Sequence, residues 1–223
     1  MYLDILFEDS ALLFVNKPAG IVVQRGYDAE EPVLLEEAMR YTQPLFLMQR
    51  LDRGTSGVMF FSRLASINAN LTRQFEGKRI RKRYVALCEG QLGEKQTIDA
   101  PLVRIGPISF GVRDGGRRAI TIVTPLRATP AGSLVAIDLL TGRTHQIRVH
   151  LAAIGHPLAG DWLYGQRNEV RPMLHARELS MTHPLSNEPL RVTAPVPDDF
   201  RDTAIERGIV SRHEDIMTLC ESS

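Results

Sequence analysis

Short apolar runs separated by polar turns dominate the first part of the chain. Residues 5–15 hold two such runs, and the turn at Lys17–Gly20 leads into a third run at 21–23. The clearest case is residues 48–62, where one apolar run enters the polar segment Arg50–Gly57 and another leaves it. This spacing predicts strands joined by tight turns, with a short loop between two buried strands in the last segment.

Other segments repeat apolar residues at helical spacing. They predict amphipathic helices packed on the sheet, at residues 32–41, 64–76, 144–155 and about 203–209. Gly77 is placed to end the second helix, while Thr144 and Gly155 are placed to cap the third.

Further apolar segments predict additional strands. They include a basic strand at 78–90 and a hairpin tip at 113–117 with its returning strand at 119–123, then strands at 133–140 and 174–181. Strands outnumber helices, and the sequence contains no repeat, low-complexity tract or obvious linker. We therefore predict one α+β domain over residues 1–223.

Composition limits the classes of protein. The chain has 223 residues, 43% of them hydrophobic, so it can bury a full core. No apolar run approaches the roughly 20 residues that span a bilayer, and the N-terminus does not resemble an export signal. Its cysteines, Cys88 and Cys220, lie far apart without metal-binding spacing. These features predict a protein of the reducing cytoplasm that has no membrane segment.

The charge is nearly balanced in total but segregated along the chain. The formal net charge is +1. Basic residues cluster in three places: Lys78, Arg79, Arg81, Lys82 and Arg83; Arg113, Arg117 and Arg118; and Arg143 with Arg148. The first cluster fits either a solvated edge strand or a phosphate-binding surface, so a neutral total can conceal a basic face.

Asp52 is the first candidate for chemistry, because it lies where two buried strands meet. A carboxylate in such a place is costly unless a partner keeps it ionised, and Arg50 and Arg53 are the nearest partners. Gly54 and Gly57 bracket the loop and permit backbone geometries that other residues resist, including the close approach of a ligand. The pattern alone equally fits a structural aspartate that is paired with an arginine under a turn.

The helix predicted at 144–155 offers the second set of candidates. Arg148 follows the buried position Ile147, close enough to the core to reach an inward carboxylate. His145 and His150 are five residues apart and not four, so they do not align on one helical face. No metal site is expected.

Several motifs, taken in chain order, resemble those of the RluA-type pseudouridine synthases. They are Asn16-Lys17-Pro18-Ala19-Gly20, Arg50-Leu51-Asp52-Arg53-Gly54-Thr55-Ser56-Gly57, Lys82-Arg83-Tyr84, Gly142-Arg143-Thr144-His145-Gln146-Ile147-Arg148-Val149-His150, Gly160-Asp161-Trp162-Leu163-Tyr164-Gly165 and Leu174-His175-Ala176. The resemblance spans the chain from about Ile5 to about Pro195. It implies a bent, mostly antiparallel or mixed sheet with flanking helices and a central catalytic cleft.

The resemblance also implies roles for individual residues. Asp52 would be the nucleophile, Tyr84 would stack on the target uracil and assist proton removal, and Arg148 would pair with the aspartate. Leu174 would pack beneath the site, and Arg50 would help displace the base. The remaining residues expected at the RNA are Arg53, Thr55, Lys78, Arg79, Lys82, Arg143, His145 and Gln146.

One departure from the family pattern is Gln49, which stands where the family usually has histidine. The chain also begins almost directly at the catalytic core, so we expect no separate N-terminal RNA-binding domain. RNA selection would then depend on the basic segments of the core.

The expected reaction converts uridine to pseudouridine in ribosomal or transfer RNA, and the protein is expected to act as a monomer. It needs no cofactor, which agrees with the lack of nucleotide-binding motifs. Two alternatives stay open at this point. One is a non-catalytic RNA-binding or chaperone protein, and the other is a hydrolase that uses Asp52 with His145 or His150.

Overall fold

The computed structural model describes residues 3–25, 32–166 and 171–221. The chain divides into two compact units. Unit 1 comprises Met1–Lys82 and Ala176–Pro195, and unit 2 comprises Arg83–His175 and Val196–Ser223. Two of the boundaries fall inside strands β5 (Arg81–Cys88) and β11 (Leu174–Thr182), and the third lies between Pro195 and Val196.

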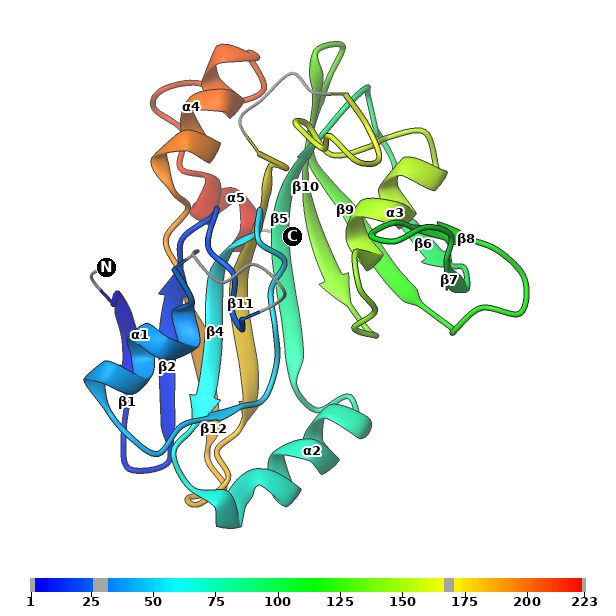
Figure 1. The fold of residues 1–223 in the computed structure, drawn as a ribbon. Coiled ribbons are helices and arrows are strands. Elements are labelled where there is room, and N and C mark those ends of the chain that lie inside the picture. Colours follow the sequence, from blue (N-terminus) through cyan, green and yellow to red (C-terminus); the bar gives the residue numbers. More distant parts are fainter. Residues whose placement is uncertain (1–2, 26–31, 167–170, 222–223) are drawn as a thin grey trace. The chain divides into compact units, whose positions relative to one another are not determined.

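Unit 1 contains antiparallel strands around the predicted loop (Figure 1). The order β1, β2, β4 is set by pairing of neighbours, β3 also pairs with β4, and β12 pairs with β11. Their bounds are β1 Ile5–Glu8, β2 Leu12–Lys17, β3 Phe46–Leu47, β4 Ser56–Ser62 and β12 Pro189–Thr193. The strands predicted around the Asp52 loop are confirmed. Residues 21–23 form only an isolated bridge, between Val22 and Val33.

The helices of unit 1 follow the apolar periodicity. They are α1 (Leu34–Tyr41) and α2 (Asn68–Glu76), the latter preceded by the short 3-10 helix η1 (Ala65–Ile67). Phe60 stacks on Phe14 with ring centroids 5.1 Å apart and on Phe75 at 6.1 Å, so aromatic contacts join α2 to the strands. Gly77 ends α2 as predicted, although the left-handed φ of 54° falls on the next residue, Lys78.

Unit 2 has its own antiparallel strands. The pairing order is β5, β10, β9, β6, and β7 pairs separately with β8. Their bounds are β6 Gln96–Asp99, β7 Leu102–Arg104, β8 Phe110–Val112, β9 Ile120–Thr129 and β10 Gly132–Leu139. Residues 113–117 do form a turn, but the prediction that they form the tip of a hairpin with the strand at 119–123 is wrong. Strand β8 pairs with the preceding β7, while β9 pairs with β10 and β6.

The helices of unit 2 are α3 (Gln146–Ala153), α4 (Asp198–Glu206) and α5 (Ile216–Glu221). Helix α3 packs beside β8 and β9 (Figure 1). The predicted Thr144 cap is wrong: the N-cap is His145, at a left-handed φ of 56°, and no side chain caps the helix. Gly155 follows the helix with a φ of 83°, as its predicted capping role requires.

Both units combine a few helices with more numerous strands, which confirms the α+β prediction. Cys88 and Cys220 are buried and form no disulfide among the described residues. In the same residues, no helix is long and apolar enough to cross a membrane.

Candidate active site

Asp52 opens a tight turn in unit 1 between β3 and β4. The backbone N–H of Thr55 donates to the Asp52 carbonyl at 3.1 Å, which closes the turn. Asp52 is half-buried, whereas Leu51 before it and Thr55 after it are buried. The turn therefore keeps Asp52 partly exposed on a segment that is fixed at both ends.

The side chain of Lys17 supports this turn through hydrogen bonds. The antiparallel register of β2 and β4 places Lys17 opposite Gly57, and the lysine side chain is 0% exposed. Its Nζ donates to the carbonyls of Pro18 and Ile21, each at 2.8 Å, and of Arg53 at 3.2 Å. A buried ammonium is tolerated because carbonyl oxygens replace its water shell. The Lys17–Gly20 turn thus fixes the residue next to Asp52.

Arg53 and Gly20 reinforce the same contact. The Gly20 N–H donates to the Arg53 carbonyl at 2.8 Å, and Arg53 Nε donates to the Gly20 carbonyl at 3.1 Å. At least part of the Arg53 guanidinium therefore supports the loop. Its expected RNA contact stays a prediction.

At Gly57 the close approach is made by the backbone of β11, whereas approach of a ligand stays a prediction. A Cβ at Gly57, where φ is 115°, would lie 2.1 Å from the Ala176 carbonyl oxygen on β11. No side chain fits in that space. The start of β4 is thereby held directly against β11 within unit 1.

Gln49 and Arg50 precede the turn and differ in environment. The Gln49 Nε2 atom is buried and has no hydrogen-bond partner among the described residues. Arg50 is exposed, which is compatible with its expected role at the RNA.

In unit 2, Arg148 has a carboxylate partner that the sequence analysis missed. Arg148 Nε donates to Asp161 Oδ2 and Nη2 donates to Asp161 Oδ1, both at 2.7 Å. The two side chains are 6% and 0% exposed. Such a two-pronged pair fixes the plane of the guanidinium. The expected pairing of Arg148 with Asp52 stays a prediction. Asp161 could have been found as a candidate because it lies in the quoted motif Gly160–Gly165.

The loop Gly160–Gly165, which carries Asp161, contacts β8 and the start of α3 through Tyr164. Its hydroxyl accepts the Phe110 N–H at 2.9 Å and lies 2.8 Å from His145 Nδ1. The left-handed backbone of His145 presents the imidazole between the rings of Phe110 and Tyr164, at centroid distances of 5.7 and 5.6 Å. His145 is therefore held by local contacts, and its RNA contact stays a prediction.

Gln146 is engaged inside unit 2. Its Oε1 accepts from the Thr141 hydroxyl at 2.7 Å and the Arg143 N–H at 3.0 Å. Its Nε2 donates to the Ile120 carbonyl and the Thr121 hydroxyl, both at 3.0 Å. Because the amide oxygen and the amide nitrogen each have two partners, the side chain has little capacity for another one. This geometry therefore does not favour the RNA contact predicted for Gln146.

His150 is also buried, and its ring lies between Thr121 Oγ1 at 2.9 Å and the Ala100 carbonyl at 3.0 Å. Burial lowers the pKa of His150 below its ordinary value, against smaller opposing effects of the Ala100 carbonyl and Asp99. The neutral ring donates from Nε2 to Ala100. His145 and His150 have separate partners and do not form a pair.

Tyr84 and Leu174 lie on strands of unit 2 and are buried, with 8% and 3% exposure. Tyr84 is opposite Ile137 in the β5–β10 ladder. An aromatic ring fixed on a strand is suited to the stacking role predicted for it.

The basic residues between positions 78 and 83 differ in their exposure. Lys78, Arg79 and Arg81 are exposed. Lys82 is half-buried with its Nζ 5.7 Å from the Phe75 ring centroid, and burial lowers its pKa. Arg83 pairs with Asp138 at 3.1 Å. The exposed members are the better candidates for phosphate contact.

Arg143 is half-buried in the segment that precedes α3. Its Nε donates to the Arg118 carbonyl at 3.2 Å, so part of the side chain supports the connection before β9. Its RNA contact stays a prediction.

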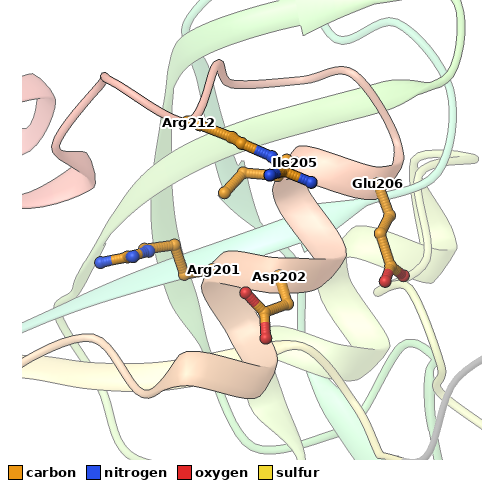
Figure 2. Close-up of a pocket in the computed structure, with 5 residues that line it drawn as sticks. All are labelled: Arg201, Asp202, Ile205, Glu206 and Arg212. Carbon is orange, nitrogen blue, oxygen red and sulfur yellow. The ribbon is translucent and has the colours of Figure 1, made fainter.

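A hollow of about 400 Å³ lies in unit 2 along α4 (Figure 2). Its lining consists of Arg201, Asp202, Ile205, Glu206 and Arg212. The charges are mixed and none of the predicted site residues lines it. We therefore do not assign the reaction to this hollow.

Comparison with known proteins agrees with the motifs. Residues 11–153 match the model of the RNA pseudouridylate synthase family. An uncharacterized RNA pseudouridine synthase of Bacillus subtilis is 39% identical over 213 residues, covering 90% of this chain and 70% of the relative. Ribosomal large subunit pseudouridine synthase D of Nitrosomonas europaea is 36% identical over 217 residues, covering 89% of this chain. This chain spans 63% of the Nitrosomonas protein.

A shorter relative and a solved structure extend the agreement. tRNA pseudouridine synthase C of Haemophilus ducreyi is 35% identical over 221 residues, covering 87% of this chain and 91% of the relative. The structure of human RNA pseudouridylate synthase domain containing 1 has a TM-score of 0.79 at 25% identity, covering 99% of this chain and 94% of the human chain. The chain belongs to the RNA pseudouridylate synthases, a family of isomerases, and is of the RluA type that the motifs predicted.

Proposed function

We propose that this chain isomerises specific uridines of ribosomal or transfer RNA, with Asp52 as the nucleophile. The observation that carries this proposal is the braced turn of Asp52. A buried lysine and a glycine without room for a side chain fix the turn, while Asp52 stays partly exposed. A fixed group on a rigid element is what positioned catalysis requires. Ribosomal and transfer RNA are the substrates named for relatives of this chain.

The proposed reaction is neutral in mass. The bond from C1′ to N1 of the uracil breaks, the base turns, and a bond from C1′ to C5 forms. C5 then loses its proton, and N1 gains one. The ionised Asp52 carboxylate acts either by attack on C1′ or on the base, or by assisting loss of the C2′ proton.

The other predicted residues have supporting roles in this proposal. The target uridine must leave the RNA stack, at a cost of about a few kcal/mol, and stacking on the Tyr84 ring offsets part of that cost. Arg148 keeps Asp52 ionised, Leu174 packs beneath the base, and Arg50 helps displace it. Lys78 and Arg79 contact phosphates from the exposed connection between α2 and β5.

We propose that both units form one catalytic domain, because the family match at residues 11–153 runs across the boundary at Lys82. We further propose that the protein acts in the cytoplasm, where ribosomal and transfer RNA function.

The test is pseudouridine mapping of total RNA from cells with and without the gene. We expect one or a few sites to disappear in the deletion strain and to return with the wild-type chain but not with Asp52→Asn. Asp202→Asn, at an exposed position on α4, is the matched control and should restore the sites.

Two results would contradict the proposal. Full restoration by Asp52→Asn would remove Asp52 from the mechanism. If every site persisted in the deletion strain, and the purified protein bound ribosomal and transfer RNA transcripts without modifying them, a binding role would replace the catalytic one.

A further inference from the structure

The β7–β8 hairpin carries a group of apolar side chains that face solvent. Ile105 and Ile108, in the connection between the two strands, are 57% and 56% exposed, and Val112 at the end of β8 is 43% exposed. Single exposed apolar residues are normal on protein surfaces, but three of them so close together on one hairpin form a patch. A patch of this kind indicates a surface that contacts a partner.

Residues 105–109, which we call the hairpin tip, are held by hydrogen bonds. The N–H groups of Ile105 and Gly106 donate to the Ser109 carbonyl at 3.0 and 3.3 Å. The guanidinium of Arg104 donates from Nε to the Gly106 carbonyl at 3.0 Å. The tip therefore has a defined conformation in the free protein, which lowers the entropy cost of binding.

Gly111 supports one side of Ile105 from across the hairpin. A Cβ at Gly111 would lie 3.2 Å from Ile105 Cδ1 and 3.4 Å from its Cγ2, so the isoleucine lies against the glycine backbone. More than half of the isoleucine nevertheless stays in water. The contact thus fixes the side chain without covering it.

Other side chains of the hairpin are packed inside unit 2. Leu102 on β7 is buried and belongs to one apolar cluster with Val149 of α3, and Phe110 on β8 packs against this cluster. The Phe110 N–H donates to the hydroxyl of Tyr164, whose ring centroid lies 5.1 Å from the guanidinium carbon of Arg148. The hairpin is therefore fixed beside α3, the helix that carries a residue proposed to act at the site (Figure 1).

The sequence around the hairpin tip is basic. Residues 101–118 contain four arginines and one aspartate, a formal charge of +3. Arg113 and Arg117 are exposed, and backbone hydrogen bonds of 3.0 and 2.9 Å between Leu102 and Arg117 place Arg117 beside β7. An apolar patch in positive surroundings fits a polyanion that also offers apolar surface. RNA meets both requirements, because its phosphates are anionic and the faces of its bases are weakly polar.

We propose that the hairpin tip is an apolar wedge, which places Ile105 and Ile108 between bases of the substrate RNA where the stack opens. This inference rests on the proposed function, in which one uridine leaves the stack. Moving that uridine leaves its neighbours without a stacking partner, and isoleucine is one of the side chains that proteins insert between unstacked bases. Arg113 and Arg117 contact phosphates beside the wedge.

Two measurements on the same RNA test the wedge. The probe is total RNA from the deletion strain, prepared with tritium at C5 of uridine. Filter binding at several salt concentrations gives the Kd of the purified protein for this RNA. Release of tritium reports isomerisation, because C5 loses its hydrogen in the proposed reaction. Urea unfolding shows that each variant is folded.

Serine variants remove the apolar surface of the tip. Ile105→Ser and Ile108→Ser should each raise the Kd by about 5- to 10-fold, because about half of each side chain is left to bury. This factor should be the same at low and high salt, since an apolar contact releases no counterions, whereas Arg117→Gln should make the salt dependence shallower. Ile108→Leu keeps the apolar area and should retain most of the affinity. Leu185→Ser is the matched control, at an aliphatic residue of unit 1 that is 50% exposed, and should bind as the wild type does.

The outcomes separate the wedge from the function on which it rests. If the folded serine variants bind and isomerise as the wild type does, the wedge is wrong while the isomerase is intact, and a protein partner would account for the patch instead. An equal loss in Leu185→Ser, or a loss that vanishes at high salt, would also overturn the wedge. A wild type that binds the RNA without releasing tritium contradicts the proposed function, and the Kd of the serine variants then still decides whether the tip contacts RNA.

Discussion

Replacing Asp161 by asparagine removes one charge from a pair that has almost no contact with water. The side chains of Arg148 and Asp161 are 6% and 0% exposed, and both contacts between them are 2.7 Å. The variant keeps the shape of the side chain but removes the carboxylate charge that faces both Nε and Nη2 of the buried guanidinium. Breaking a buried pair from one side typically costs about 3–5 kcal/mol. We expect Asp161→Asn to lower the free energy of unfolding by about that amount.

Unit 2 contains a second arginine–aspartate pair with similar geometry, in which the aspartate is more exposed. Arg171 donates to Asp199 from Nε at 2.6 Å and from Nη2 at 3.0 Å, with the same two-pronged geometry. The Asp199 side chain, however, is 50% exposed. Hydrogen bonding from Arg171 lowers the pKa of the Asp199 carboxyl, but water can replace that carboxylate when it is removed. We therefore expect Asp199→Asn to cost about 1 kcal/mol.

Urea unfolding of the wild type and both variants, followed by circular dichroism, measures the difference. Both pairs lie in unit 2, so the same transition reports on them. A cost for Asp199→Asn equal to that of Asp161→Asn would refute the reasoning, because burial would then not decide the magnitude. Adding Arg148→Met to Asp161→Asn should recover part of the loss, since the buried positive charge is then removed together with its carboxylate partner.

Three further predictions concern binding, pH and packing. The double variant Lys78→Ala, Arg79→Ala should bind single-stranded RNA with a shallower slope of log K against log salt concentration. The slope should change by about 1.4, or about 0.7 per lost phosphate contact, whereas Lys95→Ala at another exposed position should leave it unchanged. An unchanged slope would place the RNA elsewhere. Burial lowers the pKa of His150 below its ordinary value of 6.5, so the unfolded chain takes up the proton at a higher pH than the folded chain does. The free energy of unfolding should therefore fall as the pH drops below about 6.5, and His150→Gln should reduce that pH dependence. A wild type equally stable at about pH 7.5 and 5.5 would contradict this assignment. Gln49→Met should leave stability unchanged or raise it by about 1–3 kcal/mol in urea unfolding, because the buried amide nitrogen has no partner among the described residues; a clear loss would show that it has one.

Local pattern was enough to predict most of the elements and the family. The apolar runs on either side of Asp52 became β3 and β4, and the helical periodicity at 64–76 became η1 and α2. These predictions succeed because side-chain alternation and turn residues act over a few positions of the chain. The ordered motifs likewise require only the linear sequence.

Charge pairing was decided by the tertiary structure. Arg148 was expected to reach a carboxylate, but its pairing with Asp161 depends on the path of the chain between them. Lys17 looked like part of a turn, yet its ammonium is the support of the Asp52 turn through the Arg53 carbonyl. The cost of burying a charge is set by which oxygen atoms surround it in space, and distant segments supply those atoms. For that reason the sequence indicated which residues carry the chemistry, and the fold determined what holds them in place.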